Sequence, residues 1–455
     1  MQKSRMKIAT LILALLPVAS FAQQHFSGIN TSSRTSLYNA ALNPAELANI
    51  STRFEANVIG LSINASSNKA TFSDLVSGND LEKIIFEGDE PTDLRIDAEV
   101  AGPGLAYKVD KWVFALSSRA YGKLDLVDID TNIGDAIVSA GINSIAGSTT
   151  ISNDYNQRLN GTTWGEIGLS AGTAIYETEA HRLTGGATLK LLFPGSYANF
   201  GADRFSGTVN NTLGNAALTN TLANLNIAYS GNLGEDFTDF GDYARSMFGK
   251  LDGVAADIGI AYRWKDALDP DPKRYRVNGG VSIRNIGSMK FSSSNNASTN
   301  YVLSIQGSES LNLNQFQNVT SIEEVESILL QSGYLNRTEN QRQEFKVKLP
   351  TVFSAYADVR LVSDLFVTLF TQQKLSDGSE NDQINTENIF SVTPRYLLSQ
   401  VEFFAPMSAN EIAGFTAGFG IRAFGFFVGS SSAITALIND SNQADAYIGY
   451  SFSIN

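Results

Sequence analysis

The connections between strand-like segments constrain the fold of this chain more than any other feature. From about residue 50 onward, apolar and polar side chains alternate in segments typical of β-strands. A soluble sandwich has no reason to keep its tight turns at one end, whereas a transmembrane barrel does. Counting from the segment Thr52–Asn64, long connections (65–93, 122–162, 194–253 and 288–345) alternate with short ones (109–110, 177–181, 265–274 and 361–364).

Fourteen segments follow this pattern, an even number that places both ends of the chain on the tight-turn side. Most are long enough to cross a bilayer as tilted strands of about 9–11 residues. Connections beyond residue 375 alternate less sharply, and 194–253 is long enough to hide another hairpin. The pattern therefore predicts an all-β protein, a transmembrane antiparallel β-barrel of about fourteen strands. The other expected strands are Leu94–Lys108, Lys111–Tyr121, Thr163–Tyr176, Arg182–Phe193, Val254–Trp264, Tyr275–Gly287, Lys346–Arg360, Leu365–Leu375, Thr386–Leu397, Gln400–Pro406, Ile412–Arg422, Gly425–Ser431 and Asp445–Ile454.

The first 22 residues have the pattern of a secretory signal peptide. Lys3, Arg5 and Lys7 precede a short apolar run, and small residues precede a cleavage site between Ala22 and Gln23. The run is too short to span a bilayer, and no later apolar run reaches the length of a transmembrane helix. The chain is therefore expected to leave the cytoplasm, either as a soluble exported protein or as a membrane barrel.

Composition excludes several classes of function. The chain has no Cys and only two His, at positions 25 and 181, so most thiolate, zinc and histidine-dependent chemistry lacks its residues. Its net charge of −13 argues against nucleic acid as a partner. A lipid hydrolase needs an oriented Ser–His pair, but His25 lies near the mature N-terminus in a segment expected to be mobile, and His181 lies in a tight turn. We expect no enzyme, no metal site and no cofactor.

Two connections contain helical patterns. Asp236–Leu251 places aromatic and aliphatic residues on one stripe. Val319–Leu330 opens with a capping box formed by Ser321 and Glu324. These helices are expected either to roof the barrel or to offer an apolar surface to a hydrophobic ligand or partner.

The segment Ser33–Asn64, with Asn43, Pro44 and Ala45 shortly before the first strand, resembles the N-terminal hatch of FadL-like outer-membrane proteins. This superfamily comprises long-chain fatty acid transporters and the PorV-type barrels of Bacteroidota. The resemblance implies a hatch at residues 23–50, in the lumen of a fourteen-stranded barrel at residues 51–455. It places the protein in the outer membrane of a Gram-negative bacterium, in contact with lipid and with helical loops outside the cell.

The C-terminal half looks like an uncharacterised Bacteroidota family of FadL/PorV-like barrels of unknown function. The resemblance rests on Leu349-Pro350-Thr351, Thr393–Tyr396, Gly425–Ser430 and Asp445–Gly449. The final strand, with Gly449, Phe452 and Ile454, is similar to the signal that barrel-insertion machinery recognises, although the chain ends in Asn455.

Two motifs invite a functional interpretation. Pro44 restricts Asn43, which can form a turn, so this site is either an ordinary turn or part of a lumen plug. Gly102-Pro103-Gly104 interrupts an expected strand and predicts a bulge. In FadL-like transporters a strand kink opens a lateral route from lumen to bilayer, and an interrupted strand ladder at 102–104 is needed for the same route here.

Three classes of function follow. The first is a channel or transporter for a hydrophobic small molecule, which predicts an apolar lumen pocket and a breach in the wall. The alternative is a PorV-like accessory or scaffold for type IX secretion or surface-protein attachment, which predicts a plugged lumen and large ordered loops. The third, a barrel enzyme, predicts a polar cluster around a histidine and is not favoured.

Overall fold

The computed structural model describes residues 25–32, 34–138, 147–212, 214–235, 248–265, 275–292 and 296–454. The expected signal peptide, its expected cleavage site at Ala22 and Gln23, and residues 236–247 of the expected helix at Asp236–Leu251 lie outside this range. Among the described helices, none combines the length and hydropathy needed to cross a lipid bilayer.

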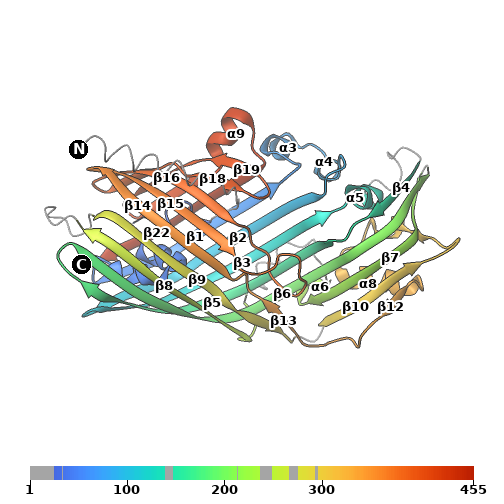
Figure 1. Cartoon of the computed structure of the whole chain (residues 1–455), viewed down its shortest axis with the longest axis horizontal. Coiled ribbons are helices and arrows are strands. Elements are labelled where there is room, and N and C mark those ends of the chain that lie inside the picture. The colour runs from blue at the N-terminus through green and yellow to red at the C-terminus, as the bar shows by residue number, and fades with distance from the viewer. Residues whose placement is uncertain are drawn as a thin grey trace.

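The chain forms one closed antiparallel β-barrel of fourteen strands, which confirms the predicted fold class (Figure 1). Eleven strands are continuous through the wall, and each of the three others consists of two shorter pieces. In order around the barrel they are β1 (Phe54–Ser67), β2 (Thr92–Val109), β3 (Trp112–Ile129), β5 (Asn156–Glu177), β6 (His181–Thr212), β8 (Gly253–Lys265), β9 (Tyr275–Phe291), β13 and β14 (Phe345–Lys348 and Val352–Val362), β15 (Leu365–Lys374), β16 (Ile389–Leu398), β17 and β18 (Val401–Phe404 and Met407–Asn410), β19 and β20 (Gly414–Ala417 and Phe419–Ala423), β21 (Phe426–Ser430) and β22 (Gln443–Ile454).

The barrel closes where the first strand meets the last. Phe54 pairs with Ile454 at the tight-turn end of the barrel, and Gly60 pairs with Gly449 at mid-height. Along β1, Ile59, Leu61 and Ile63 are exposed, while Ser62 and Asn64 are buried inside. The period-2 pattern thus gives an apolar outer face and a polar lumen, as expected for a transmembrane barrel.

Prolines interrupt the wall near the middle of the later strands. The expected strand Lys346–Arg360 is in fact two pieces, because residues 349–351 leave the ladder between β13 and β14. Pro350 has no N–H to donate to a neighbouring strand. A second break follows Phe404, where the Pro406 carbonyl accepts a hydrogen bond of 2.8 Å from Gly418 N.

The long connection 194–253 does contain a hairpin. Strand β6 continues past the barrel and returns as β7 (Asn215–Ser230), which then pairs with β10 (Ala297–Ile305) (Figure 1). We call this sheet extension the platform. Its other short elements are β4 (Gly147–Ser152), β11 (Leu311–Asn312), β12 (Leu335–Arg337), α5 (Thr131–Val138), α6 (Asn232–Glu235), η2 (Leu313–Phe316) and α8 (Ile322–Gln331).

The platform has its own hydrophobic core. Helix α8 packs there, and the predicted cap is present, because Ser321 Oγ accepts a hydrogen bond of 3.0 Å from Glu324 N. Farther along α8, the buried Glu326 accepts hydrogen bonds from Tyr229 and Tyr301. This corrects one expectation, because α8 covers the platform and does not roof the lumen. The remaining helices, α3 (Phe72–Ser77), α4 (Leu81–Ile85) and α9 (Ala433–Asn439), lie at the same long-loop end.

Candidate functional site

The N-terminal segment crosses the barrel lumen from one wall to the other. We call residues 25–50 the hatch; it contains helix α2 (Ser36–Leu42) and the 3-10 helix η1 (Pro44–Asn49). At one wall, Phe26 and Tyr38 belong to a buried aromatic cluster with Phe404, Phe427 and Tyr447. At the opposite wall, η1 lies against β5, β6 and β8. The expected hatch motif is therefore inside the barrel, fully buried.

Asn43 joins the two helices of the hatch and binds the wall. Its side chain accepts a hydrogen bond of 3.0 Å from Ala45 N, which caps η1 as the turn-former interpretation predicts. The same amide donates to the backbone carbonyls of Ile260 at 2.9 Å and Val281 at 3.3 Å. Pro44 occupies the first turn of η1, where no N–H is needed.

A patch of glycines makes room for this motif. Gly172 in β5, Gly186 in β6 and Gly259 in β8 lie directly opposite one another across the three strands. A Cβ on Gly186 would lie 2.6 Å from Ala45 N, and one on Gly172 would lie 3.0 Å from Ala48 N. Gly259 and Gly280, farther along the wall, leave the same space for the Asn43 side chain. We call Gly172, Gly186, Gly259 and Gly280 the glycine seat.

Buried carboxylates add directional contacts between hatch and wall. Glu46 accepts a hydrogen bond of 2.9 Å from Asn278, and it also binds Tyr356 and lies 3.5 Å from Arg263. Two carboxylates of the wall, in turn, accept hydrogen bonds from donors of the hatch. Glu55 accepts from Leu37 N at 2.9 Å, and Glu402 accepts from Ser32 Oγ at 2.7 Å.

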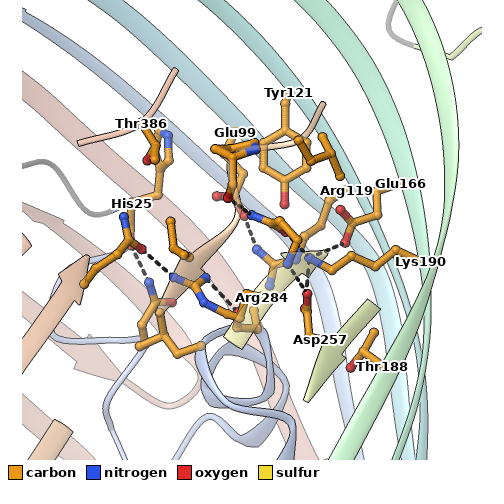
Figure 2. Close-up of a pocket in the computed structure, with 18 of the residues that line it drawn as sticks. His25, Glu99, Arg119, Tyr121, Glu166, Thr188, Lys190, Asp257, Arg284 and Thr386 are labelled. Carbon is orange, nitrogen blue, oxygen red and sulfur yellow. Dashed lines mark hydrogen bonds and ion pairs between the residues drawn. The ribbon is translucent and has the colours of Figure 1, made fainter. Parts of the chain in front are cut away.

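A cavity of about 160 Å³ lies between the hatch and the barrel wall. Figure 2 shows Glu99, Arg119, Glu166, Lys190 and Asp257 pointing toward one another across it. Lys190 Nζ lies 2.9 Å from Asp257 and 3.6 Å from Glu166, and Arg119 pairs with Glu99. We call this cavity the chamber. Its charged side comes from β2, β3, β5, β6, β8 and β9, while its apolar side comes from Leu37, Ala40, Leu42, Leu349, Pro350, Val352 and Ile389.

Arg284 of β9 borders the chamber and differs from the other chamber cations in its hydrogen-bond partners. It donates to the hatch carbonyl of Ala41 at 3.1 Å, to Gln372 at 2.5 Å and to Ser354 at 3.2 Å. All three acceptors are neutral, and its Nε has no partner among the described residues. A guanidinium group is thus held by the hatch backbone at the border of the chamber.

A connection folded into the barrel closes the chamber at the long-loop end. Residues 376–388, which we call the inner loop, pair with β13 through Ile384 N and Lys348 O at 3.0 Å. The fully buried Arg158 donates to Glu380 O at 2.5 Å and to Asn385 at 2.9 Å. The sequence did not predict this role, since residues 376–385 were expected to be an ordinary long connection and residues 386–388 the start of the strand Thr386–Leu397.

The expected bulge at Gly102-Pro103-Gly104 is present in the wall beside the hatch. Ala101 pairs with Arg119 and Gly104 with Ser117, so two residues on β2, 102 and 103, lie opposite the single residue 118 on β3. The carbonyl groups freed by this shift bind side chains, since Asn57 donates to Gly102 O at 2.7 Å and Ser118 donates to Pro103 O at 2.9 Å. A cavity of only about 10 Å³ separates the bulge from Tyr38 of the hatch. The ladder is interrupted there, but no open route passes through it.

His25 does not lie in a mobile segment as expected, whereas His181 lies in the expected tight turn. His25 is held by Ser62 Oγ at 2.8 Å and by Asp97 at 3.1 Å, which corrects the expectation of a mobile segment. The serine, histidine and aspartate resemble the triad of a hydrolase. However, Asp97 is also paired with Lys123, and Ser62 is buried and does not line the chamber. We interpret the three residues as an anchor of the hatch. His181, in its tight turn, binds Tyr262 at 2.7 Å.

Comparisons with known proteins give one family model and several solved structures. The model of a family described as "Family of unknown function (DUF5723)" matches residues 44–431. Comparison with curated proteins finds no match. Among solved structures, the toluene transporter TbuX of Ralstonia pickettii is 10% identical with a TM-score of 0.44, over 94% of this chain and 98% of that one.

Two further solved structures are similar to this chain at equally low identity over most of its length. A FadL homologue of Pseudomonas aeruginosa is 11% identical with a TM-score of 0.32, over 95% of this chain and 98% of that one. The toluene transporter TodX of Pseudomonas putida is 10% identical with a TM-score of 0.30, over 95% and 99% of the two chains. One of these structures is a FadL homologue, the class of protein that the sequence resembles. At these identities the likeness concerns the fold.

The glycine seat yields a direct test of hatch docking. Replacing Gly186→Val places a side chain against the Pro44 and Ala45 backbone, an overpacking that costs about 1–3 kcal/mol. Because the chain has no Cys, a single cysteine at Ala48, which is buried, reports hatch position by its rate of maleimide labelling. We expect labelling to accelerate at least about tenfold in the Gly186→Val background.

The matched control is Gly185→Ala on the outer face of the same strand. There the added Cβ meets only the flexible end of Ile175, at 2.8 Å, so labelling should stay at the wild-type rate. Equal labelling in the wild-type and Gly186→Val backgrounds would show that the glycines do not hold the hatch.

The anchor at His25 should respond to pH. Burial lowers the pKa of His25, but the charge and hydrogen bond of Asp97 outweigh it, so the pKa lies above the usual 6.5. Glu99 raises this pKa further and Lys123 opposes it. The anchor is therefore complete below about pH 6.5 and is lost as pH rises through the raised pKa. With only two histidines, NMR of isotope-labelled imidazoles can follow both, and Asp97→Asn should lower the His25 pKa. A His25 pKa at or below the usual 6.5 would contradict this account.

Proposed function

Since the chain belongs to the family of unknown function DUF5723, whose description assigns no activity, we propose its function from its geometry. We propose that it is a gated outer-membrane passage for a small hydrophobic molecule that also carries a charged or hydrogen-bonding group. The hatch is the gate. In this arrangement the tight-turn end of the barrel faces the periplasm, and the platform faces outward.

One observation carries this proposal: the wall lines the chamber on its charged side, but two segments that do not belong to the wall, the hatch and the inner loop, close it. Apart from the aromatic cluster at Phe26 and Tyr38, the hatch touches the wall through glycines, backbone carbonyls and a few carboxylates. Such contacts can be broken without disturbing the strand ladder. A segment that fills a lumen yet does not belong to the wall is suited to move as a gate.

The lining of the chamber indicates the class of molecule. Arg284 binds only neutral acceptors at the border of the chamber, so a purely apolar ligand would leave this cation without a charged partner, and burying unmatched polar groups is costly. A purely ionic solute would make no use of the apolar side at Leu37, Leu42 and Ile389. An amphipathic molecule satisfies both sides.

The size of the chamber implies that the observed state is closed. At about 160 Å³ it is smaller than the 300–1,000 Å³ typical of ligand pockets. Admission of a ligand therefore requires the hatch or the inner loop to shift. The bulge at Gly102–Gly104 lies beside the hatch, and we propose it as the place where a ligand with an apolar portion leaves for the bilayer.

A second function is favoured by the platform. It is a large ordered extension with its own hydrophobic core, including Tyr301, Leu303 and Leu329. A transport barrel does not need such a surface, whereas a PorV-like accessory protein for secretion or surface attachment does. Mass spectrometry of material that co-purifies with the barrel separates the two: an amphipathic small molecule supports transport, and a stoichiometric protein partner supports the accessory role.

Gating can be tested by loosening the hatch at Glu46. In Glu46→Ala, Arg263, Asn278 and Tyr356 lose their shared acceptor, and breaking a buried pair of this kind costs about 3–5 kcal/mol. In planar lipid bilayers we expect the wild-type barrel to show rare or no conductance steps and Glu46→Ala to show frequent ones.

The control for this test is Glu177→Ala, which removes an exposed carboxylate that binds Arg182 and Lys265 at the tight-turn end. Its conductance should match the wild type. If Glu46→Ala, shown to be folded by its heat-modifiable migration in gels, conducts no more than wild type, then the hatch is a permanent plug and the accessory function is preferred.

A further inference from the structure

A second cavity lies beneath the hatch, at the tight-turn end of the barrel. It has a volume of about 580 Å³ and is bordered by residues of three turns, at 363–364, 399–400 and 424–425, and by both ends of the barrel sheet. It is separate from the chamber, with which it shares no lining residue. Arg34 of the hatch and Arg422 of strand β20 both line it.

Arg422 is the most unusual group in this cavity. Its residue is only 9% exposed, and its Nε has no hydrogen-bond partner among the described residues. No described carboxylate forms an ion pair with it within 4.0 Å. Buried guanidinium groups normally have such partners, because desolvating an unpaired charge is costly. Arg395, two strands away on β16, shows the usual case, since it binds both Asp358 and Glu402.

The carboxylates near Arg422 are already engaged. Glu55 lines the same cavity, but it accepts the Leu37 N–H at 2.9 Å at the start of helix α2. Glu402 is bound by Arg395 at 2.8 Å and by Ser32 at 2.7 Å. Asp364 also borders the cavity, in the turn between β14 and β15. The two arginines therefore face a space in which most of the negative charge is directed elsewhere.

Hydroxyl groups complete the lining. The Ser451 hydroxyl is buried and, like Arg422 Nε, has no partner among the described residues. The cavity is also bordered by Ser36, Ser51, Ser363, Ser399 and Ser453. Guanidinium groups surrounded by hydroxyl donors suit an anion with several oxygens, because each oxygen can accept more than one hydrogen bond.

We propose that this cavity binds a phosphate group, which bridges Arg34 of the hatch and Arg422 of the wall. A carboxylate offers only two oxygens to the same set of donors. The phosphate can come from the headgroup of a phospholipid or from a soluble phosphate of the periplasm. This proposal does not require the hatch to move. An anion bound there would nevertheless add a contact that holds the hatch against the wall.

The test uses the full mature chain, purified in detergent. Isothermal titration with inorganic phosphate addresses the soluble source, and native mass spectrometry with phosphatidylglycerol, compared with uncharged diacylglycerol, addresses the lipid source. We expect saturable binding of at least one phosphate probe by the wild type. Arg422→Gln and Arg34→Gln should each weaken it about tenfold, as expected for the loss of charge-assisted hydrogen bonds.

The matched control is Lys111→Gln, which removes an exposed positive charge from the β2–β3 turn at the same end of the barrel. It should bind like the wild type. If Arg422→Gln fails to fold, Arg34→Gln decides alone, because Arg34 lies in the hatch and outside the wall. The proposal is overturned if the wild type binds neither phosphate probe, or if binding is unchanged in the folded arginine variants.

Discussion

The docking of the hatch on the glycine seat is the contact on which the rest of the interior depends. Without side chains at Gly172 and Gly186, the Pro44 and Ala45 backbone can approach the wall closely enough for Asn43 to reach two strand carbonyls. Any larger residue there would displace the hatch toward the chamber. The position of α2, and with it the apolar side of the chamber, follows from this close approach.

The charges in the lumen follow from the same geometry. Because the outer face must be apolar in a membrane, the polar half of every strand points inward. The resulting charges largely neutralise one another, as Lys190 does with Asp257 and Arg119 with Glu99. Arg284 departs from this rule, because the hatch carbonyl of Ala41 takes part of its hydrogen-bonding capacity. Movement of the hatch would therefore change the partners of one chamber cation directly.

Much of the fold could be predicted from the sequence, because strand number and closure depend on a repeating pattern. The alternation of Ile59, Leu61 and Ile63 with other residues indicates a strand with one lipid-facing side. The lengths of the connections distinguish the two ends of the barrel. The hatch motif at Asn43, Pro44 and Ala45 was recognisable as well. The prediction of a continuous strand was wrong at Leu349–Thr351, because a proline breaks a strand that period-2 alternation alone would continue.

The site itself was less predictable, since it depends on contacts between residues far apart in sequence. Gly186 and Gly280 look like ordinary strand glycines, although the paired glycines at 185–186 and 279–280 were a signal that a backbone approaches closely. The sequence around Glu46 does not reveal its contact with Arg263. The sequence around Arg158 does not indicate that this side chain holds the inner loop. Such partners become visible only when the barrel register brings them together.

The most direct test of the central claim is hydrogen–deuterium exchange of the mature barrel in lipid, read over residues 36–49. A hatch docked on the glycine seat predicts that these amides exchange as slowly as those of the neighbouring strands β6 and β8, because most of the segment is buried. Exchange of the whole segment within seconds would contradict it, since a hatch held so loosely could neither close the chamber nor serve as its gate.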